Sequence, residues 1–232
     1  MRKVDITKNK SIDQRIKERR NAQNEVQEER LIRITEEFRK GFDFLKKYGK
    51  AATIFGSARR GFDAEIYEKT RKLAGLLAKE NFTVVTGGGP GVMEAANQGA
   101  YEAGGKSLGI NIIFPSERER KNPYVQESES FHYFFSRKVM LAFASQVYFF
   151  LPGGFGTLDE FFELVTLVQT NKVTPMPIIL VHKEYWTPLL EWIEKELYGN
   201  GAAIDKEDMN IYDLVDTPEE AMELVEKYMS SL

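Results

Sequence analysis

The sequence predicts an α/β protein with a Rossmann-like, doubly wound parallel sheet, helices on both faces and an N-terminal helical extension. From residue 51 onward, short β-rich runs alternate with amphipathic helical patterns. The strand candidates are near-continuous apolar runs, as expected for strands buried on both faces. Glycine-rich turns follow three of them. We therefore expect one catalytic domain over residues 50–232, preceded by a helical arm over residues 1–49.

The arm is more basic than the rest of the chain. Residues 1–50 hold 15 Lys and Arg against 9 Asp and Glu, although the whole chain has a net charge of −3. Such asymmetry marks either an arm for an anionic partner or a solvated helical extension. Basic and acidic residues alternate here, which favours the extension, and we expect no nucleic-acid partner.

Only the second part of the arm has an apolar stripe. Residues 1–30 are polar, with almost no apolar period, and predict a frayed or solvent-exposed helical arm. Beyond them an apolar stripe predicts a helix that ends before Gly49 and packs on the main domain or on a second subunit. The stripe consists of Leu31, Ile34, Phe38, Phe42 and Leu45.

The first elements of the domain follow this alternation closely. A β-rich run predicts a strand over residues 51–55, and an amphipathic pattern predicts a helix over residues 67–79. Residues 82–86 form the next strand, and residues 92–103 form a helix after a glycine-rich turn. Residues 107–113 are again β-rich and predict a strand.

The middle of the domain is less regular. Residues 114–128 are charged and contain two prolines, which predicts a loop. An aromatic run predicts a short strand over residues 131–135, followed by a helix over residues 136–144. Residues 146–151 are strongly β in character and predict a strand.

The last elements continue the strand–helix order. Helices are predicted over residues 158–170 and 186–197, on either side of a strand over residues 177–181. A final strand is predicted over residues 211–215 and a final helix over residues 218–229.

Composition limits the chemistry. The 232-residue chain is 42% hydrophobic and 29% charged, as in globular proteins with a real core. It has no cysteine, which excludes disulfides, cysteine-bound metals and thiol nucleophiles. With two histidines, His132 and His182, we expect no metal site and assign no cofactor.

The pattern also bears on location. The first residues lack the apolar stretch of a secretory signal. The most apolar run, residues 147–151, is too short to cross a bilayer. We therefore expect a cytoplasmic protein with no membrane partner, which is compatible with the absence of cysteine.

Three glycine-rich turns follow strands at equivalent positions. In open parallel sheets, ligands bind beyond the carboxyl ends of the strands. Glycine lets the backbone approach a ligand closely, and the N–H groups at the start of the next helix attract an anion. Three such turns together predict a phosphate site. Its candidate residues are Gly56, Ser57, Gly87, Gly88, Gly89, Gly91, Gly153, Gly154, Gly156 and Thr157.

The motifs differ from the common dinucleotide and triphosphate sites. A Walker loop needs Lys and Ser or Thr after its last glycine, whereas Val92 and Met93 follow Gly91. The first turn, residues 56–61, also lacks the dinucleotide fingerprint. A mononucleotide is therefore the favoured ligand.

Two segments resemble the paired signatures of the LONELY GUY family of nucleoside 5′-monophosphate phosphoribohydrolases, long labelled "lysine decarboxylase-like". These are Gly87-Gly88-Gly89-Pro90-Gly91-Val92-Met93 and Pro152-Gly153-Gly154-Phe155-Gly156-Thr157-Leu158-Asp159-Glu160. The second matches PGGxGTxxE at every fixed position. Arg137-Lys138-Val139-Met140 matches the family's Arg-Lys-x-Met segment. The similarity covers roughly residues 50–200.

The resemblance implies a dimeric building block that hydrolyses AMP-like or cytokinin riboside nucleotides to a base and ribose 5-phosphate. It places Arg137 and Glu160 at the catalytic centre. It also places the phosphate on Gly154, Gly156 and Thr157, and the ribose near Gly87–Gly91. The chain departs from plant-like members at Ser136, usually acidic, and at Glu94, usually glycine; both bear on the choice of base.

The chemistry of the residues agrees with this resemblance. Breaking a ribosyl C–N bond develops positive charge on the sugar, and a carboxylate can stabilise that charge and activate water. Glu160 lies one helical turn after the glycines, although a first-turn acid also suits the helix dipole. Arg137 could orient Glu160, bind phosphate or form a surface ion pair. Lys138 and Glu94 are further binding candidates, each with a surface alternative.

Two broader questions stay open at this point. A non-catalytic nucleotide sensor could use the same pocket, but it would need no carboxylate beside the sugar. A lysine decarboxylase would need pyridoxal phosphate bound to a lysine as a Schiff base. No lysine in this sequence lies in an evident cofactor-binding motif. The apolar stripe of the arm and the aromatic-rich residues 131–150 predict a homodimer or a higher even oligomer.

Overall fold

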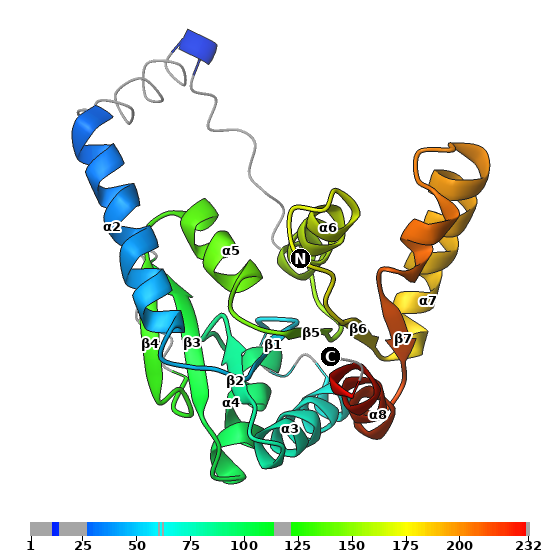
Figure 1. The fold of residues 1–232 in the computed structure, drawn as a ribbon, viewed down its shortest axis with the longest axis horizontal. Coiled ribbons are helices and arrows are strands. Elements are labelled where there is room, and N and C mark those ends of the chain that lie inside the picture. Colours follow the sequence, from blue (N-terminus) through cyan, green and yellow to red (C-terminus); the bar gives the residue numbers. More distant parts are fainter. Residues whose placement is uncertain (1–10, 14–26, 60, 62, 114–121, 231–232) are drawn as a thin grey trace.

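The computed structural model describes residues 11–13, 27–59, 61, 63–113 and 122–230. Within these residues, seven parallel strands form one sheet in the order β4-β3-β2-β1-β5-β6-β7 (Figure 1). Helices cover both faces, so the predicted doubly wound α/β fold is confirmed. The strand order reverses between β1 (Ala51–Phe55) and β5 (Val147–Phe150).

Most elements lie close to their predicted positions. The other strands are β2 (Thr83–Thr86), β3 (Ser107–Ile112), β4 (Glu127–Phe131), β6 (Ile178–Val181) and β7 (Asp213–Val215). The helices are α2 (Gln27–Leu45), α3 (Ala64–Lys79), α4 (Val92–Glu102), α5 (Phe134–Ala142), α6 (Phe155–Gln169), α7 (Lys183–Trp192) and α8 (Pro218–Met229). A π-helical segment (Ile193–Asn200) and a 3₁₀ turn (Lys206–Asn210) precede β7.

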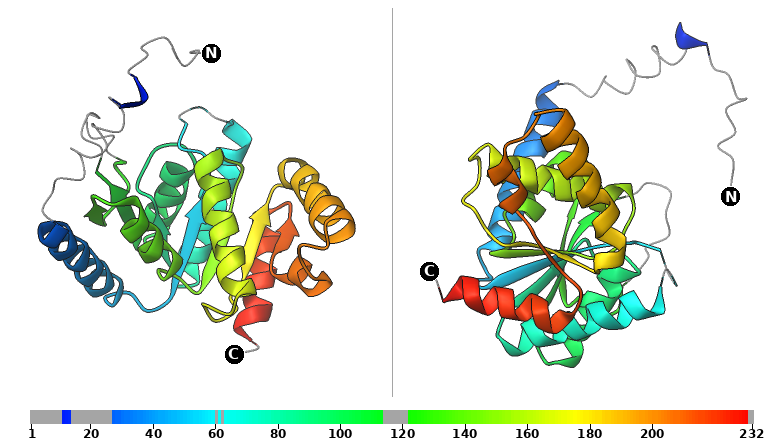
Figure 2. Two further views of the ribbon diagram at one scale, coloured as in Figure 1. Left: turned by 90° about the horizontal axis from the view of Figure 1, so that it is seen from above. Right: turned by 90° about the vertical axis from the view of Figure 1, so that its right-hand side faces the viewer.

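The helices form two layers. Helices α3, α4 and α8 cover one face of the sheet, and α2, α5, α6 and α7 lie on the other (Figures 1 and 2). Strand β5 shows why, because its residues alternate between faces: Val147 and Phe149 join the first core, whereas Tyr148 and Phe150 join the second.

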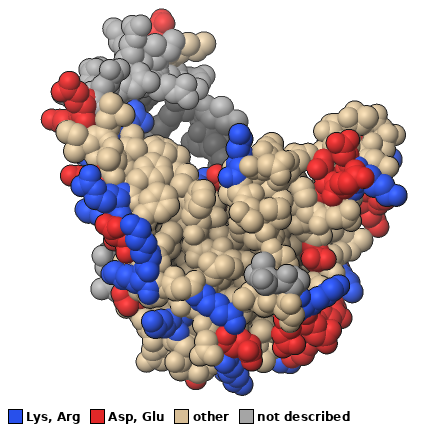
Figure 3. All heavy atoms as spheres, in the orientation of Figure 1, with Lys and Arg blue, Asp and Glu red and all other residues tan. Residues whose placement is uncertain are grey.

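Helix α2 packs on the main domain, one of the two predicted outcomes for the apolar stripe of the arm. Phe44 is buried, and Phe38 and Leu45 pack against the second core. The start of the stripe stays uncovered, since Leu31 is 61% exposed. Lys and Arg gather along α2 at the left of Figure 3, whereas the middle of that face carries few charges. Most of residues 1–30 lies outside the described residues.

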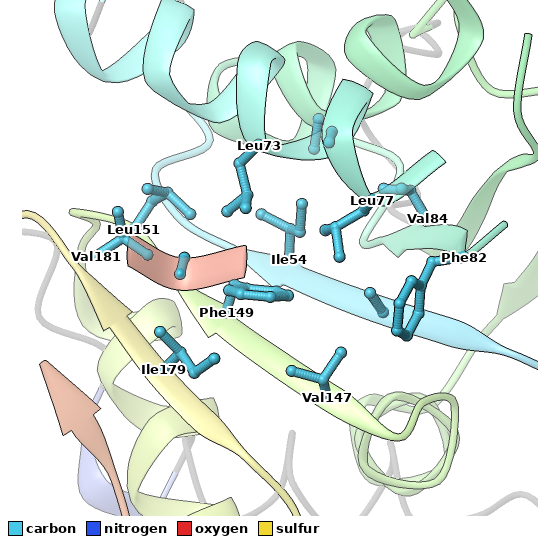
Figure 4. Packing of buried hydrophobic residues seen from close by; sticks show 14 of the residues in the cluster. Ile54, Leu73, Leu77, Phe82, Val84, Val147, Phe149, Leu151, Ile179 and Val181 are labelled. Carbon is cyan, nitrogen blue, oxygen red and sulfur yellow. The ribbon is translucent and has the colours of Figure 1, made fainter. Parts of the chain in front are cut away.

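The first core gives the sheet its rigid base. Figure 4 shows Ile54 of β1 and Phe149 of β5 in contact with the helix layer that contributes Leu73 and Leu77. All four side chains are fully buried. Burial of such side chains contributes roughly 2 kcal/mol each, so the carboxyl ends of β1 and β5 are held in fixed positions.

Two predictions for residues 114–135 were wrong. The loop was predicted to continue to residue 128 and a strand to cover residues 131–135, but β4 covers Glu127–Phe131 and α5 starts at Phe134. Strand β4 lies at the edge of the sheet and three of its residues are exposed. Its sequence, Glu-Ser-Glu-Ser-Phe, therefore lacks the apolar run on which the prediction relied.

The helix predicted over residues 186–197 also differs. It begins earlier, at Lys183, after His182 with a left-handed φ of 92°. Pro188 lies inside it, and after Trp192 the helix continues in π geometry to Asn200. Proline removes a backbone donor and disturbs the local ladder, so a plain helical period over this segment is misleading. No helix among the described residues is long and apolar enough to cross a membrane.

Candidate functional site

The three glycine-rich turns lie side by side at the carboxyl edge of the sheet, where the strand order reverses. Ser57, after β1, donates its N–H to the Pro152 carbonyl at 3.1 Å. Its own carbonyl accepts from the Val92 N–H at 2.9 Å. These two bonds tie the first turn to the turns after β2 and β5. Open α/β sheets bind ligands at such a reversal point, so the structure brings the predicted turns together where a ligand is expected.

Close packing explains several of the glycines. A Cβ on Gly56 would overlap the Val92 side chain, and a Cβ on Gly91 would overlap the Ser57 carbonyl oxygen. Gly91 also has a φ of +73°, which L-residues rarely adopt. A Cβ on Gly89 would lie 2.6 Å from the Met93 methyl group. Close contacts with the Val92 and Met93 side chains and with the Ser57 carbonyl thus leave no space for larger residues in the first two turns.

A buried polar network supports the second turn from below. The Thr86 hydroxyl accepts from the Gly88 N–H at 2.9 Å and donates to Asn97 Oδ1 at 2.7 Å. The Asn122 amide donates to Asn97 Oδ1 at 2.9 Å and to the Gly89 carbonyl at 3.1 Å. Because Asn97 is fully buried, these bonds hold the turn in one conformation.

The third turn leads into α6 and leaves donors free. A Cβ on Gly153 would overlap the Thr157 hydroxyl, whereas one on Gly154 or Gly156 would meet nothing within 4 Å. The helix has no side-chain cap at Gly154. Within the described part of the chain, the N–H groups of Phe155 and Gly156 have no protein acceptor. Free first-turn N–H groups and the helix dipole favour a bound anion, which makes this helix start a candidate phosphate site.

Glu160 lies one turn further along the same inward face of α6. Thr157 and Glu160 are both buried, at 6% and 9% exposure, and residues three apart on a helix are neighbours. Burial raises the pKa of the Glu160 carboxyl to about 7, an effect that the positive charges of Lys138 and Arg137 oppose. A carboxyl group with this pKa can exchange protons at neutral pH.

Arg137 is built into the site rather than paired at the surface. Its Nε donates to the Ile110 carbonyl at 2.8 Å, and Nη2 donates to the Gly87 carbonyl at 3.4 Å. Burial lowers the pKa of the guanidinium, and the nearby Glu160 carboxylate opposes that change. Arg137 thus links β3 to the second turn and interacts electrostatically with Glu160, rather than forming a surface ion pair.

Lys138 is the second cation near Glu160, and it is held by two carboxylates. Its Nζ lies 2.8 Å from Asp159 Oδ2 and 3.0 Å from Glu163 Oε2, both on α6. Burial would lower the pKa of this ammonium, but hydrogen bonds to Asp159 and Glu163 outweigh it and raise the pKa. Because these partners already occupy it, Lys138 suits charge compensation better than direct contact with phosphate.

Two buried acceptor atoms near the second turn have no hydrogen-bond partner among the described residues. They are Glu94 Oε2 and Asn111 Oδ1. A Cβ on Gly88 would overlap Asn111 Oδ1, so this oxygen lies directly against the turn. Buried polar atoms are normally bonded, which makes both atoms candidates for ligand contact. Asn111 was missed from sequence, and its only signal was an amide inside an otherwise apolar strand.

Glu37 of α2 is another contact that the sequence did not reveal. Its carboxylate accepts hydrogen bonds from the N–H groups of His132 and Tyr133 and from the Ser136 hydroxyl. These donors surround the start of α5, which has no side-chain cap from its own N-cap residue, Tyr133. Since 95 residues separate Glu37 from His132, no local pattern could have predicted the contact.

Other candidate features lie apart from Glu160. A hollow of about 270 Å³ beside the first two turns is lined by residues that include Arg59, Asp63 and Tyr67. Among the described residues, no group of three or more His, Asp or Glu side chains could hold a metal ion. Glu160 and Arg137 are therefore the candidates that the geometry places beside the three turns.

Comparisons with known proteins show the family to which the sequence is similar. The family model described as "Possible lysine decarboxylase" matches residues 93–225. A cytokinin riboside 5′-monophosphate phosphoribohydrolase from Rhodococcoides fascians is 29% identical over 147 residues, which cover 62% of this chain and 74% of the relative. A probable enzyme of the same name from Oryza sativa subsp. japonica is 30% identical over 177 residues, with 75% and 71% covered.

Solved structures share the fold. The molybdenum cofactor binding protein from Rippkaea orientalis matches with a TM-score of 0.58 and 22% identity, over 78% of this chain and 98% of its own. The molybdenum cofactor carrier protein from Chlamydomonas reinhardtii matches with a TM-score of 0.57 and 18% identity, over 78% and 98%. At this level of identity the likeness concerns the architecture.

Proposed function

Because the chain belongs to the LONELY GUY family, we propose that it hydrolyses the N-glycosidic bond of a nucleoside 5′-monophosphate. The products are a free base and ribose 5-phosphate. The observation that carries this proposal is the position of Glu160, buried one helical turn beyond a helix start that suits a phosphate. Its pKa of about 7 suits proton transfer in a cell.

The phosphate would lie at the start of α6. The free N–H groups of Phe155 and Gly156 and the hydroxyl of Thr157 would bind its oxygens. The open space at Gly154 and Gly156 supports this placement, because packing within the protein does not require glycine there. The ribose would then extend along α6 toward Glu160, with its hydroxyl groups near Glu94 and Asn111.

The reaction follows from this placement. As the bond between C1′ and the base nitrogen breaks, its electron pair leaves with the base and positive charge develops on the sugar. The Glu160 carboxylate stabilises that charge and takes a proton from the water that attacks C1′. The proton that Glu160 takes from the water is passed on to the departing base, which restores the carboxylate, so one nucleotide and one water give one base and one ribose 5-phosphate.

The two cations have different roles in this scheme. Arg137, anchored on two backbone carbonyls, keeps positive charge beside Glu160 and has further N–H groups for the phosphate. Lys138 compensates the charges of Asp159 and Glu163 and so favours the ionised form of Glu160. These roles favour an enzyme over a sensor, since binding alone would not require a buried carboxylate beside the sugar.

The residues do not fit the cofactor implied by the label of the family model. A decarboxylase of that kind needs a lysine that forms a Schiff base with pyridoxal phosphate. Such a lysine must become neutral to attack, and neutrality requires a lowered pKa. Lys138, the lysine beside Glu160, instead has a raised pKa and two carboxylate partners. We therefore assign no step to this cofactor.

A second part of the proposal concerns assembly and location. Phe134, Phe135 and Phe143 are 56%, 45% and 54% exposed, and Phe42 of α2 contacts Phe143. Exposed aromatic groups of this extent are typical of interfaces, so we propose a homodimer or a higher even oligomer. Light scattering at micromolar concentration should give at least twice the chain mass of 26.6 kDa.

We further propose a cytoplasmic location, with which the absence of cysteine is compatible.

The direct test of the function is incubation of the purified protein with AMP. Adenine and ribose 5-phosphate should appear in equal amounts, as followed by chromatography and a reducing-sugar assay. Parallel reactions with GMP, CMP and IMP would give the preferred base. Release of phosphate or of no base at all would refute the proposal.

A further inference from the structure

We propose that Glu37, on the N-terminal helix, is a positioning residue for Arg137 and thereby makes α2 part of the catalytic apparatus. The catalytic consequence rests on the function proposed above. The positional claim stands on the contacts at the start of α5.

The first observation is the number of donors that meet at one carboxylate. Glu37 Oε1 accepts the His132 N–H, while Oε2 accepts the Tyr133 N–H at 3.3 Å and the Ser136 hydroxyl. These groups belong to the first turn of α5 and the two residues before it. A negative charge at a helix start also meets the positive end of the dipole.

The second observation connects this carboxylate to Arg137 in two steps. The Tyr133 carbonyl accepts the Arg137 N–H at 3.2 Å and the Ser136 hydroxyl at 2.9 Å. The same Tyr133 and Ser136 donate to Glu37. The first turn of α5 is therefore held by the Glu37 carboxylate and by the Tyr133 carbonyl. From this turn, Arg137 Nε donates to the Ile110 carbonyl at 2.8 Å.

Helix α2 does not need Glu37 in order to pack. Phe38, Phe44 and Leu45 already pack the helix against the second core. The centroids of the Phe38 and Phe135 rings also lie 6.5 Å apart. Glu37 therefore adds little apolar contact but supplies acceptor oxygens at the start of α5, where helix N–H groups have no partner within the helix itself. Its role is therefore to position the start of α5 by hydrogen bonds and charge, and not to hold α2 on the domain.

The test replaces Glu37 by glutamine, which keeps the shape but has one acceptor oxygen and adds two amide donors that would face N–H groups. Glu36→Gln, an exposed neighbour on the same helix, is the control. Glu37→Gln should lower kcat for AMP roughly tenfold, because Glu37 would no longer hold Arg137 in position. The change in KM should be smaller. Glu36→Gln should match the wild type.

A double-mutant cycle separates positioning from simple destabilisation. If Glu37 acts through Arg137, Glu37→Gln should cause no further loss of kcat in an Arg137→Ala background. An equal loss in both backgrounds, or wild-type kcat in Glu37→Gln, would overturn the proposal. Ser136→Ala, which removes one donor to Glu37, should give a smaller loss that also vanishes in that background, and it provides the test if Glu37→Gln fails to fold.

A crystal structure of the Glu37→Gln protein gives a readout that requires no turnover. The proposal expects Arg137 Nε to leave hydrogen-bond distance of the Ile110 carbonyl, while Glu36→Gln keeps it at about 2.8 Å. An unmoved Arg137 would overturn the positional claim. Failure of the wild type to release adenine would refute the proposed function alone, since the crystallographic comparison would still decide the role of Glu37.

Discussion

The Thr157 hydroxyl fills the space beside Gly153, where a Cβ would overlap it. Packing therefore requires glycine at the start of the third turn. The same turn contains Gly154 and Gly156, where a Cβ would meet no protein atom within 4 Å. Close approach of a ligand is our explanation for those two glycines.

Gly156→Ala should separate stability from binding. Alanine in the first turn of α6 should stabilise the protein by roughly 0.5–1 kcal/mol, yet its methyl group should weaken AMP binding by crowding the phosphate. Gly75→Ala in α3, whose Cβ would make only an ordinary contact at 3.5 Å, is the control and should leave AMP binding unchanged. Thermal unfolding and calorimetric titration measure the two effects. Unchanged AMP affinity in Gly156→Ala would count against the phosphate placement.

The carboxyl edge of the sheet was predictable because glycine turns and apolar strands are local patterns. The three turns, α4, α6 and β5 lie where the sequence predicted them within a few residues. The edge strand β4 was missed because exposed alternating Glu and Ser residues carry no apolar signal. The start of α7 was missed because it depends on a left-handed His182 rather than on a hydrophobic period.

Lys138→Met should shift the pH dependence of turnover. Burial raises the pKa of Glu160 to about 7, and Lys138 is the neighbouring charge that opposes this most. Because hydrolysis requires the ionised carboxylate, kcat of the wild type should rise with pH to a plateau above about 7. Removing the ammonium raises the pKa of Glu160 further and moves the midpoint to higher pH. Exposed Lys172→Met is the control, and a midpoint unchanged in Lys138→Met would contradict this electrostatic account.

Glu160→Gln should be more stable than the wild type, and this difference in the free energy of unfolding should grow as the pH rises. The carboxyl titrates near 4.5 when unfolded and at about 7 when folded, so the native wild type binds more protons between these values and loses stability across that range. The gain from Glu160→Gln should therefore grow by on the order of 3 kcal/mol between pH 4.5 and 7. Urea unfolding at pH 5 and pH 8 measures it. An equal gain at both pH values would mean that the pKa is not raised.

Two truncated chains should show that turnover depends on helix α2 but not on residues 1–29. A chain that begins at Arg30 keeps Glu37 and Phe44 and should hydrolyse AMP at nearly the wild-type rate. A chain that begins at Lys50 loses Phe44 from the second core and exposes the apolar groups beneath it, so it should unfold far more easily and lose turnover. Activity in the Lys50 chain would show that residues 50–232 are a self-sufficient domain. Inactivity of a folded Arg30 chain would assign residues 1–29 to the site.

The candidate site was predictable to the extent that its chemistry resides in motifs. Arg137 and Glu160 lie in segments with fixed spacing, and the structure brings the two charges close enough to influence each other. Asn111 and Glu37 make their contacts across the fold: Asn111 lies against Gly88, and Glu37 accepts hydrogen bonds from a helix start 95 residues away. Such pairs appear only when the chain has folded, since neither residue has a distinctive neighbour in sequence.

The central claim is that Glu160 stabilises the transition state of glycosidic cleavage, and the rate of adenine release from AMP by Glu160→Gln tests it most directly. The variant should bind AMP with near wild-type affinity, because the phosphate contacts remain, while kcat falls roughly a hundredfold or more. Arg137→Ala should also impair turnover, and the two losses should not add. Release of adenine by Glu160→Gln at the wild-type rate would contradict the account.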